Sequence, residues 1–209
     1  MIELFLGVFI PLFIIVNPSS TLALFSAITS SHSKKERIKT AKSAAMYAAI
    51  LLLIFAFAGS AILEYLRIDI YSLRIAGGIL LAFVGLDMTR RGQQFGESQP
   101  GKEQKADYAL VPLAMPSLAG PGAITVIIVS MKNLTALPDI TWLLAIIIAI
   151  IAILLTMIIT FIIFLSSTFV IKVLGKKGMD AFTRVMGLLT VAIAVQFALT
   201  GLASWAATL

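Results

Sequence analysis

Two short interruptions within apolar stretches carry the residues that could bind a small anion. In the first, Asn17-Pro18 is followed by three hydroxyl side chains, and the second reads Gly120-Pro121-Gly122. Asn is preferred immediately before a helix, and Pro is preferred at the first helical position. Each interruption therefore predicts the start of a new helix, where free backbone N–H groups and the positive end of the helix dipole attract negative charge. The residues expected to form the substrate site surround the two interruptions: Asn17, Pro18, Ser19, Ser20, Thr21, Ala119, Gly120, Pro121, Gly122, Ala123 and Thr125.

The charges of the chain favour a small zwitterion as the ligand of these helix starts. All ten acidic residues lie at the ends of apolar stretches or in loops, so no carboxylate neutralises the N–H groups. The helical turns before each interruption leave backbone carbonyls unpaired, around 14–16 and 117–119, and these suit an ammonium group. No Lys, Arg or His lies at this depth, so a singly charged anion would have no stronger partner than the helix N–H groups. The alternative is that the prolines only kink packed helices, as Pro and Gly commonly do in membranes.

Six apolar stretches must position these residues, and their composition indicates an all-α membrane protein. Of the 209 residues, 60% are hydrophobic and 12% are charged, whereas about 25% are charged in a soluble domain. A membrane span needs about 20 apolar residues, and we expect six spans, at 4–28, 43–63, 70–88, 109–131, within 142–169 and at 182–205. Only 75–86 of the third is free of charge, so a re-entrant segment is its alternative. The acidic start and the long first run predict no secretory signal peptide.

The distribution of Lys and Arg predicts the orientation of the chain. Thirteen of the 16 Lys and Arg residues lie in three loops: after the first span, after the third span and before the sixth span. The other three lie in the remaining loops. Cytoplasmic loops are enriched in Lys and Arg, so we expect both termini on the extracytoplasmic side of the cell (inner) membrane. This bias accounts for the net charge of +6 without a nucleic-acid partner. The polar segment 93–107, with Gly, Pro, Gln and mixed charges, predicts a flexible cytoplasmic connector.

The connector divides the chain into two halves of three spans, 1–92 and 108–209, which resemble each other. Residues 10–24 ("IPLFIIVNPSSTLAL") and 111–126 ("VPLAMPSLAGPGAITV") both open with Pro-Leu and are interrupted again by proline. Residues 73–85 ("LRIAGGILLAFVG") match 183–195 ("TRVMGLLTVAIAV"), with an arginine and a glycine at the same spacing. Because each half has an odd number of spans, we expect the second to be inverted relative to the first. Coincidence between apolar segments is the alternative.

In an inverted repeat, the breaks in the first and fourth spans meet at the membrane midplane. The new helices then start there and run in opposite directions, so their positive ends face one small volume. Unpaired N–H groups in hydrocarbon are costly, so irregular backbone at this depth requires a cavity or a cover of protein. We expect the backbone N–H of Gly122 to point into such a cavity, because glycine lets a ligand approach the backbone closely.

At these interruptions the chain resembles the MarC family of six-span membrane proteins. Residues 112–125 ("PLAMPSLAGPGAIT") closely match the second broken-helix motif of that family, and "IPLFIIVNPSS" resembles the first. The resemblance covers nearly the whole chain. It implies a fold related to the lysine-exporter superfamily and transport of small neutral amino acids such as glycine and alanine. The family's first motif usually continues with Gly, Asn and, two residues later, Pro, where this chain has Ser20, Thr21 and Ala23.

The sequence thus predicts a secondary transporter of small neutral amino acids and not an enzyme. The chain has no Cys, its one His lies in a basic loop, and no acidic pair lies within a span, so we expect no catalytic site, metal or cofactor. The alternatives are a channel or exporter for other small solutes, and a non-transporting membrane assembly partner. The coupling ion and the oligomeric state stay open. The small-residue pairs Gly78/Ala82 and Ala194/Ala198 are expected to pack helices within the bundle, with Gly78→Ala leaving most activity.

Overall fold

The computed structural model describes residues 1–92 and 109–208, and every regular element among them is helical. In chain order the elements are α1 (Ile2–Val16), α2 (Pro18–Ile28), α3 (Lys34–Tyr65), α4 (Ile70–Arg91), the irregular segment η2 (Ala109–Leu118), α5 (Pro121–Thr135), α6 (Trp142–Leu165) and α7 (Ser167–Ala206). Local sequence explains two of the starts. Ser33 and Glu36 form a reciprocal capping box before α3, and the Thr141 hydroxyl accepts from the Leu144 N–H at the start of α6.

The apolar helices agree with a multi-pass membrane protein. Five helices are long and apolar enough to cross a membrane when α1 and α2 count as one, and the bent pair of η2 and α5 would supply a sixth. The prediction of an all-α membrane protein is therefore confirmed. The start of the last helix differs from the prediction, because α7 begins at Ser167 and not near 182. A left-handed backbone at Gly175 (φ 63°) interrupts it, and the long apolar run follows from Lys177.

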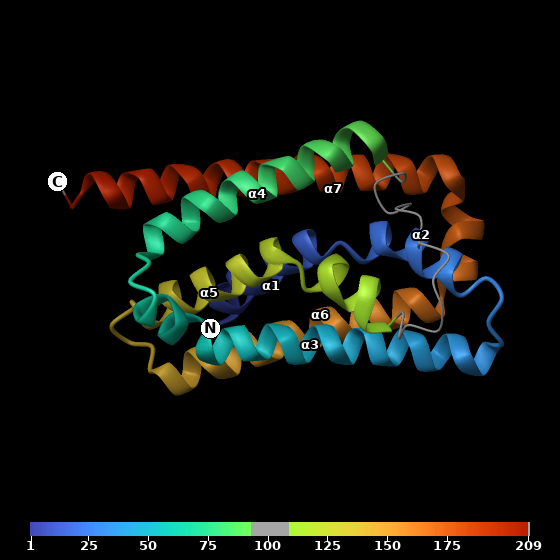
Figure 1. Cartoon of the computed structure of the whole chain (residues 1–209), viewed down its shortest axis with the longest axis horizontal. Helices are drawn as coiled ribbons and strands as arrows, with labels where there is room; N and C mark the ends of the chain where they lie inside the picture. Colours follow the sequence, from blue (N-terminus) through green and yellow to red (C-terminus); the bar gives the residue numbers. More distant parts are fainter. Residues whose placement is uncertain (93–108, 209) are drawn as a thin grey trace.

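Helices α4 and α7 form one layer, the broken helices lie in the middle, and α3 and α6 form the opposite layer (Figure 1). Both helices of the last pair bury alanines: Ala44 and Ala48 of α3, and Ala145 and Ala152 of α6, have no exposed surface. Small side chains let helix axes approach closely where hydrocarbon surrounds the bundle. This arrangement places the two interruptions between layers, away from the lipid-facing surface.

Glycines bring α4 and α7 together in antiparallel register. A Cβ atom added at Gly78 would lie 2.7 Å from the Ala194 carbonyl oxygen, and one added at Gly85 would lie 2.8 Å from the Gly187 carbonyl oxygen. The expected packing role of Gly78 and Ala194 is confirmed. A methyl group at Gly78 would meet backbone atoms of α7, which cannot move aside as a side chain does, so Gly78→Ala should cost stability. That Gly78→Ala leaves most activity stays a prediction.

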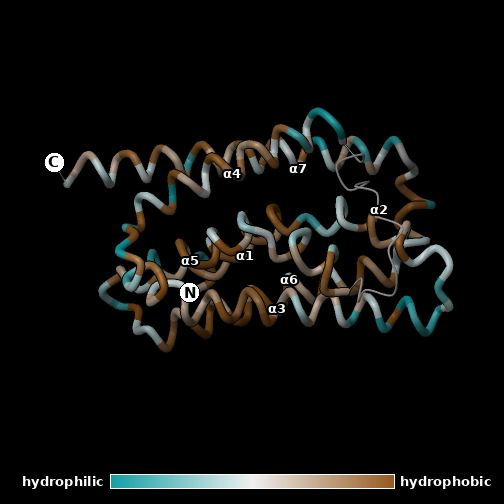
Figure 2. Tube along the Cα trace, in the orientation of Figure 1, coloured by the Kyte–Doolittle hydropathy of each residue, from teal (hydrophilic) through white to brown (hydrophobic). Residues whose placement is uncertain are grey.

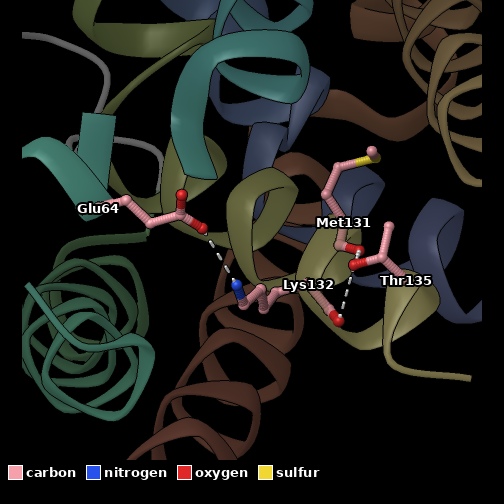
Figure 3. Close-up of polar contacts among 4 residues, drawn as sticks. All are labelled: Glu64, Met131, Lys132 and Thr135. Atoms are coloured by element: carbon pink, nitrogen blue, oxygen red, sulfur yellow. Dashed lines mark hydrogen bonds and ion pairs between the residues drawn. The ribbon is translucent and has the colours of Figure 1, made fainter. Parts of the chain in front are cut away.

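The two ends of the bundle differ in charge. Hydrophilic residues gather where α3 and α7 begin and α4 ends, at the right of the view, and this end carries most Lys and Arg (Figure 2). At the opposite end, Lys132 of α5 pairs with Glu64 of α3 at 3.6 Å, beside the Thr135 hydroxyl, which donates to the Met131 carbonyl (Figure 3). There Arg74 donates to Ser204 at 3.3 Å and to Asn133. The predicted connector, 93–107, lies outside the described residues.

Candidate functional site

The first interruption separates α1 from α2 at the predicted residues. Asn17 has a left-handed backbone (φ 41°, ψ 72°), and its N–H donates to the Phe13 carbonyl at 3.0 Å. Asn adopts this conformation more readily than most residues and often ends a helix in this way. Pro18 is the first residue of α2 and has no N–H, so the Ile14 carbonyl loses the donor that a continuous helix would supply. The end of α1 thus exposes an acceptor for a cationic group.

The hydroxyl side chains after the first break bond back to Asn17. Ser19 Oγ donates to Asn17 Oδ1 at 2.6 Å, and Ser20 Oγ donates to the Asn17 carbonyl at 3.0 Å. The N–H groups of Ser20 and Thr21 point to the same carbonyl, at 3.2 and 3.5 Å. Asn17 occupies the predicted position before the helix, but its side chain makes no capping hydrogen bond; its amide donates to Met88 Sδ of α4 at 3.9 Å. The start of α2 is therefore largely satisfied from within.

The second interruption has a different local cause. Val111 and Met115 have extended backbone within η2, so the chain before the break is irregular and not the regular half-helix of the first repeat. It bends by 56° into α5. Gly120 precedes α5 and Pro121 is its first residue, both as predicted.

The start of α5 leaves backbone donors free. The Ile124 N–H donates to the Gly120 carbonyl at 3.1 Å, which is the first hydrogen bond of the helix. Within the part of the chain that the structure describes, the N–H groups of Gly122 and Ala123 have no hydrogen-bond acceptor. Two such groups at one helix start, with the dipole behind them, are able to donate hydrogen bonds to an anionic group.

The two interruptions lie side by side. A Cβ atom added at Gly122 would be 3.3 Å from Cγ2 of Ile15, so the start of α5 contacts the last turn of α1. From this middle region, α2 and α5 run away in opposite directions (Figure 1). The donors of α5 are therefore next to the end of α1, where the Ile14 carbonyl has lost its helical partner. A group with an anionic and a cationic end matches this pair.

One face of α4 covers both interruptions, and sequence reasoning missed it. At the second break, Thr125 Cγ2 would be 2.2 Å from a Cβ at Gly77, and Leu81 Cδ2 would be 2.5 Å from a Cβ at Gly122. At the first break, Met88 Sδ accepts a hydrogen bond from the Asn17 amide. Leu81 and Met88 are seven residues apart, about 10 Å along the helix, so the breaks are staggered. The spacing of Gly77, Leu81 and Met88 marks this face in the sequence.

The start of α5 is covered on one side by Leu81. A Cβ atom added at Gly122 would lie 2.5 Å from Leu81 Cδ2 and 3.3 Å from Ile15 Cγ2, and Leu81 has no exposed surface. A cover of protein is one of the two ways in which irregular backbone is tolerated within a membrane. A ligand on this side of the helix start requires the Leu81 side chain to move, and the cavity expected beside the Gly122 N–H stays a prediction.

The remaining predicted residues are mostly buried. Ala119, Ala123 and Thr125 are 0%, 2% and 4% exposed, whereas Pro121 is exposed. Thr125 is not directed at the break, because its hydroxyl donates to the Pro121 carbonyl at 2.9 Å and its methyl group packs on α4. Residues 17–21 are all buried. The structure therefore brings both groups of residues into the interior, but Thr125 serves packing.

Charged side chains take no part in either break. Among the described residues, no ion pair or side-chain hydrogen bond at residues 14–21 or 119–125 involves Asp, Glu, Lys or Arg. The described residues also contain no group of three or more His, Asp or Glu that could hold a metal ion. The chemistry of the site is that of backbone dipoles.

Comparison with known proteins places the chain in a family. Residues 2–206 match the model of the MarC family integral membrane proteins. The chain is 40% identical over 206 residues to a UPF0056 membrane protein of Methanocaldococcus jannaschii, covering 96% of this chain and 97% of that protein. It is 33% identical over 215 residues to the UPF0056 inner membrane protein MarC of Salmonella paratyphi A, covering 96% of each. No solved structure matches. The chain therefore belongs to the MarC family of integral membrane proteins.

Proposed function

We propose that this protein is a secondary transporter, and not an enzyme, that moves small neutral amino acids of the size of glycine and alanine across the cell membrane. One observation carries the proposal: the start of α5, with two free N–H donors, lies against the end of α1 inside a membrane bundle. A buried helix start without a protein carboxylate favours an anionic ligand group. The residues proposed to bind it are 17–21 around the first break and 119–123 around the second, without Thr125.

The end of α1 supplies a hydrogen-bond acceptor for the cationic end of the ligand. The α-carboxylate would accept from the N–H groups of Gly122 and Ala123, and the ammonium group would donate to the carbonyl of Ile14, which Pro18 leaves without a donor. Leu81 Cδ2 would lie 2.5 Å from a Cβ at Gly122, so on this side a ligand takes only the space that the Leu81 side chain gives up. A short amino-acid side chain fits this restriction, and a long or charged one does not.

We infer the inverted repeat, which alternating access requires, from the alignment of 73–85 with 183–195. This alignment equates each residue of α4 with one 110 positions later in α7. The two helices run antiparallel, with Gly78 against Ala194 and Gly85 against Gly187, as equivalent helices of two inverted halves must. Two halves related in this way can rock against each other around a central site.

The proposed orientation puts both termini on the extracytoplasmic side. The helix ends rich in Lys and Arg gather at one end of the bundle, and this end would face the cytoplasm. At the opposite end the positive charge of Lys132 is paired with the carboxylate of Glu64.

A binding screen followed by flux measurement tests the proposal. Purified protein is melted in the presence of each amino acid, because a ligand that binds only the folded state raises its melting temperature. We expect glycine and alanine to raise it and glutamate and lysine to leave it unchanged. Proteoliposomes loaded with the stabilising amino acid should then show saturable counterflow. Flux without saturation would identify a channel, and the absence of both binding and flux would favour an assembly partner.

A further inference from the structure

A second polar site lies at the basic end of the bundle, where α2 ends after starting at the first helix break. A cavity of about 410 Å³ opens where the end of α2, the start of α3 and the end of α6 meet. Its volume is within the range of roughly 300–1,000 Å³ of pockets that hold small ligands. Three basic side chains line it: His32, Lys34 and Arg37. The transport proposal makes no use of this cavity.

Arg37 is held in place within the cavity wall. Its guanidinium donates to the Ser167 hydroxyl at the start of α7. The guanidinium carbon lies 5.7 Å from the centre of the Phe25 ring, and Phe25 stacks on Phe164 with ring centres 4.5 Å apart. A guanidinium over an aromatic face is favourable and fixes the orientation of its donors. Arg37 is thus pre-organised to bind a planar or tetrahedral oxyanion.

The positive charge of the cavity has no carboxylate partner in its lining. His32 Nδ1 is a buried atom with no hydrogen-bond partner among the described residues. The Glu36 carboxylate is held by the N–H and hydroxyl of Ser33, at 2.8 and 2.6 Å, and it does not line the cavity. A buried polar atom without a partner is costly, and a bound acceptor would remove that cost. The composition of the lining therefore favours a bound anion.

We propose that this cavity binds a phosphate group, carried either by an anionic phospholipid or by soluble phosphate. Phosphate oxygens accept charge-assisted hydrogen bonds from Lys34, Arg37 and His32. Apart from Thr168, the remaining wall is apolar and continues outward: Ile38 and Leu165 line the cavity and are 40% and 46% exposed. This continuity with the lipid-facing surface favours the phospholipid, whose acyl chain would lie along those side chains. Basic pockets between membrane helices commonly hold lipid headgroups in this way.

Lipid retention by the purified full-length protein tests the proposal. The protein is equilibrated with equal amounts of phosphatidylglycerol and phosphatidylcholine in detergent, and the retained lipids are counted by native mass spectrometry. We expect wild type to prefer phosphatidylglycerol, and K34Q/R37Q to reduce that preference by about tenfold, as loss of charge-assisted hydrogen bonds predicts. The matched control is K35Q/K39Q, which removes two charges from exposed positions of the same helix outside the cavity. It should retain the wild-type preference.

A second arm separates the two sources of phosphate and guards against misfolding. Inorganic phosphate, compared with chloride at equal ionic strength, should raise the melting temperature of wild type and not that of K34Q/R37Q. A phosphate effect without a lipid preference identifies soluble phosphate as the ligand. If K34Q/R37Q does not fold, H32Q keeps the contacts of Arg37 and should still lower phosphate binding several-fold. Equal loss in K34Q/R37Q and K35Q/K39Q, or a wild type indifferent to both probes, would overturn the proposal.

Discussion

Asn17 illustrates how backbone conformation, and not side-chain capping, places a polar residue at a membrane helix break. Its left-handed φ of 41° ends α1, and its carbonyl receives the Ser20 and Thr21 N–H groups of α2. The side chain only adds bonds to Ser19 and to Met88. Residues 17–21 were predictable as a helix start because proline acts locally. The role of the Asn17 side chain was not predictable, because its partner Met88 is 71 residues away.

The conformation of Asn17 can be tested by two substitutions that both remove its amide. Asn17→Gly keeps access to the left-handed region, whereas Asn17→Ala adds a strain of about 1–2 kcal/mol there. We therefore expect Asn17→Ala to melt at a lower temperature than Asn17→Gly, as measured by thermal unfolding in detergent. Equal melting temperatures would contradict this account, because the left-handed backbone at residue 17 would then add no strain to alanine.

A branched side chain at Gly122 should block binding and also strain the contact with α4. Gly122→Val would push on Leu81, and overpacking of this kind typically costs about 1–3 kcal/mol. In the double variant Gly122→Val/Leu81→Ala, the space is restored, so stability should recover relative to the sum of the two single changes. Alanine binding should not recover, because the valine still covers the N–H groups. Wild-type binding by a folded Gly122→Val protein would remove the start of α5 from the site.

Among the elements, α4 has the largest effect on the site, and sequence reasoning assigned it only a packing role. Its Gly78 and Gly85 face α7, and its Gly77, Leu81 and Met88 cover the two breaks. The small-residue spacing did predict helix contacts. It could not predict which face meets which partner, because that depends on the tertiary arrangement. The same limit applies to the space at the Cβ position of Gly122, because Leu81, a residue in another helix, sets it.

Two glycine-to-alanine changes should have opposite effects on stability. A Cβ at Gly85 would meet the Gly187 carbonyl and the Val191 N–H nitrogen at 2.8 and 2.9 Å, so Gly85→Ala should destabilise by roughly 1–3 kcal/mol. Gly7 in α1 has no atom within 4 Å of its Cβ position, so Gly7→Ala should stabilise by about 0.5–1 kcal/mol. Thermal unfolding of both purified variants measures the difference. Tolerance of alanine at Gly85 would mean that α4 and α7 are further apart.

For the whole molecule, the layered bundle suggests which parts move during transport. α4 and α7 contact each other through glycines and cover the breaks from one side, whereas α3 and α6 pack from the other (Figure 1). Access to the start of α5 requires α4 to withdraw Leu81. We therefore expect the α4–α7 pair to shift as a unit, with Gly175 as one flexible point because its backbone (φ 63°) has open space around it.

The proposed orientation can be measured directly, because the chain has no Cys. A single cysteine at Ser33, in the basic α2–α3 turn, should be shielded from an impermeant thiol reagent added to intact cells. One at Thr208, at the other end of the bundle, should be labelled. Both should react after permeabilisation. Labelling at Ser33 in intact cells would reverse the topology, together with the leaflet assigned to the basic end.

The central claim is that helix N-termini bind the carboxylate of a small amino acid, and glycine compared with glycinamide tests it most directly. The two ligands have the same size and the same ammonium group, but only glycine carries the negative charge that a helix dipole stabilises by up to about 2 kcal/mol. Titration calorimetry with purified protein should detect binding of glycine and none of glycinamide. Equal affinity for the two would contradict the account, because the free N–H groups of Gly122 and Ala123 would then not select the ligand.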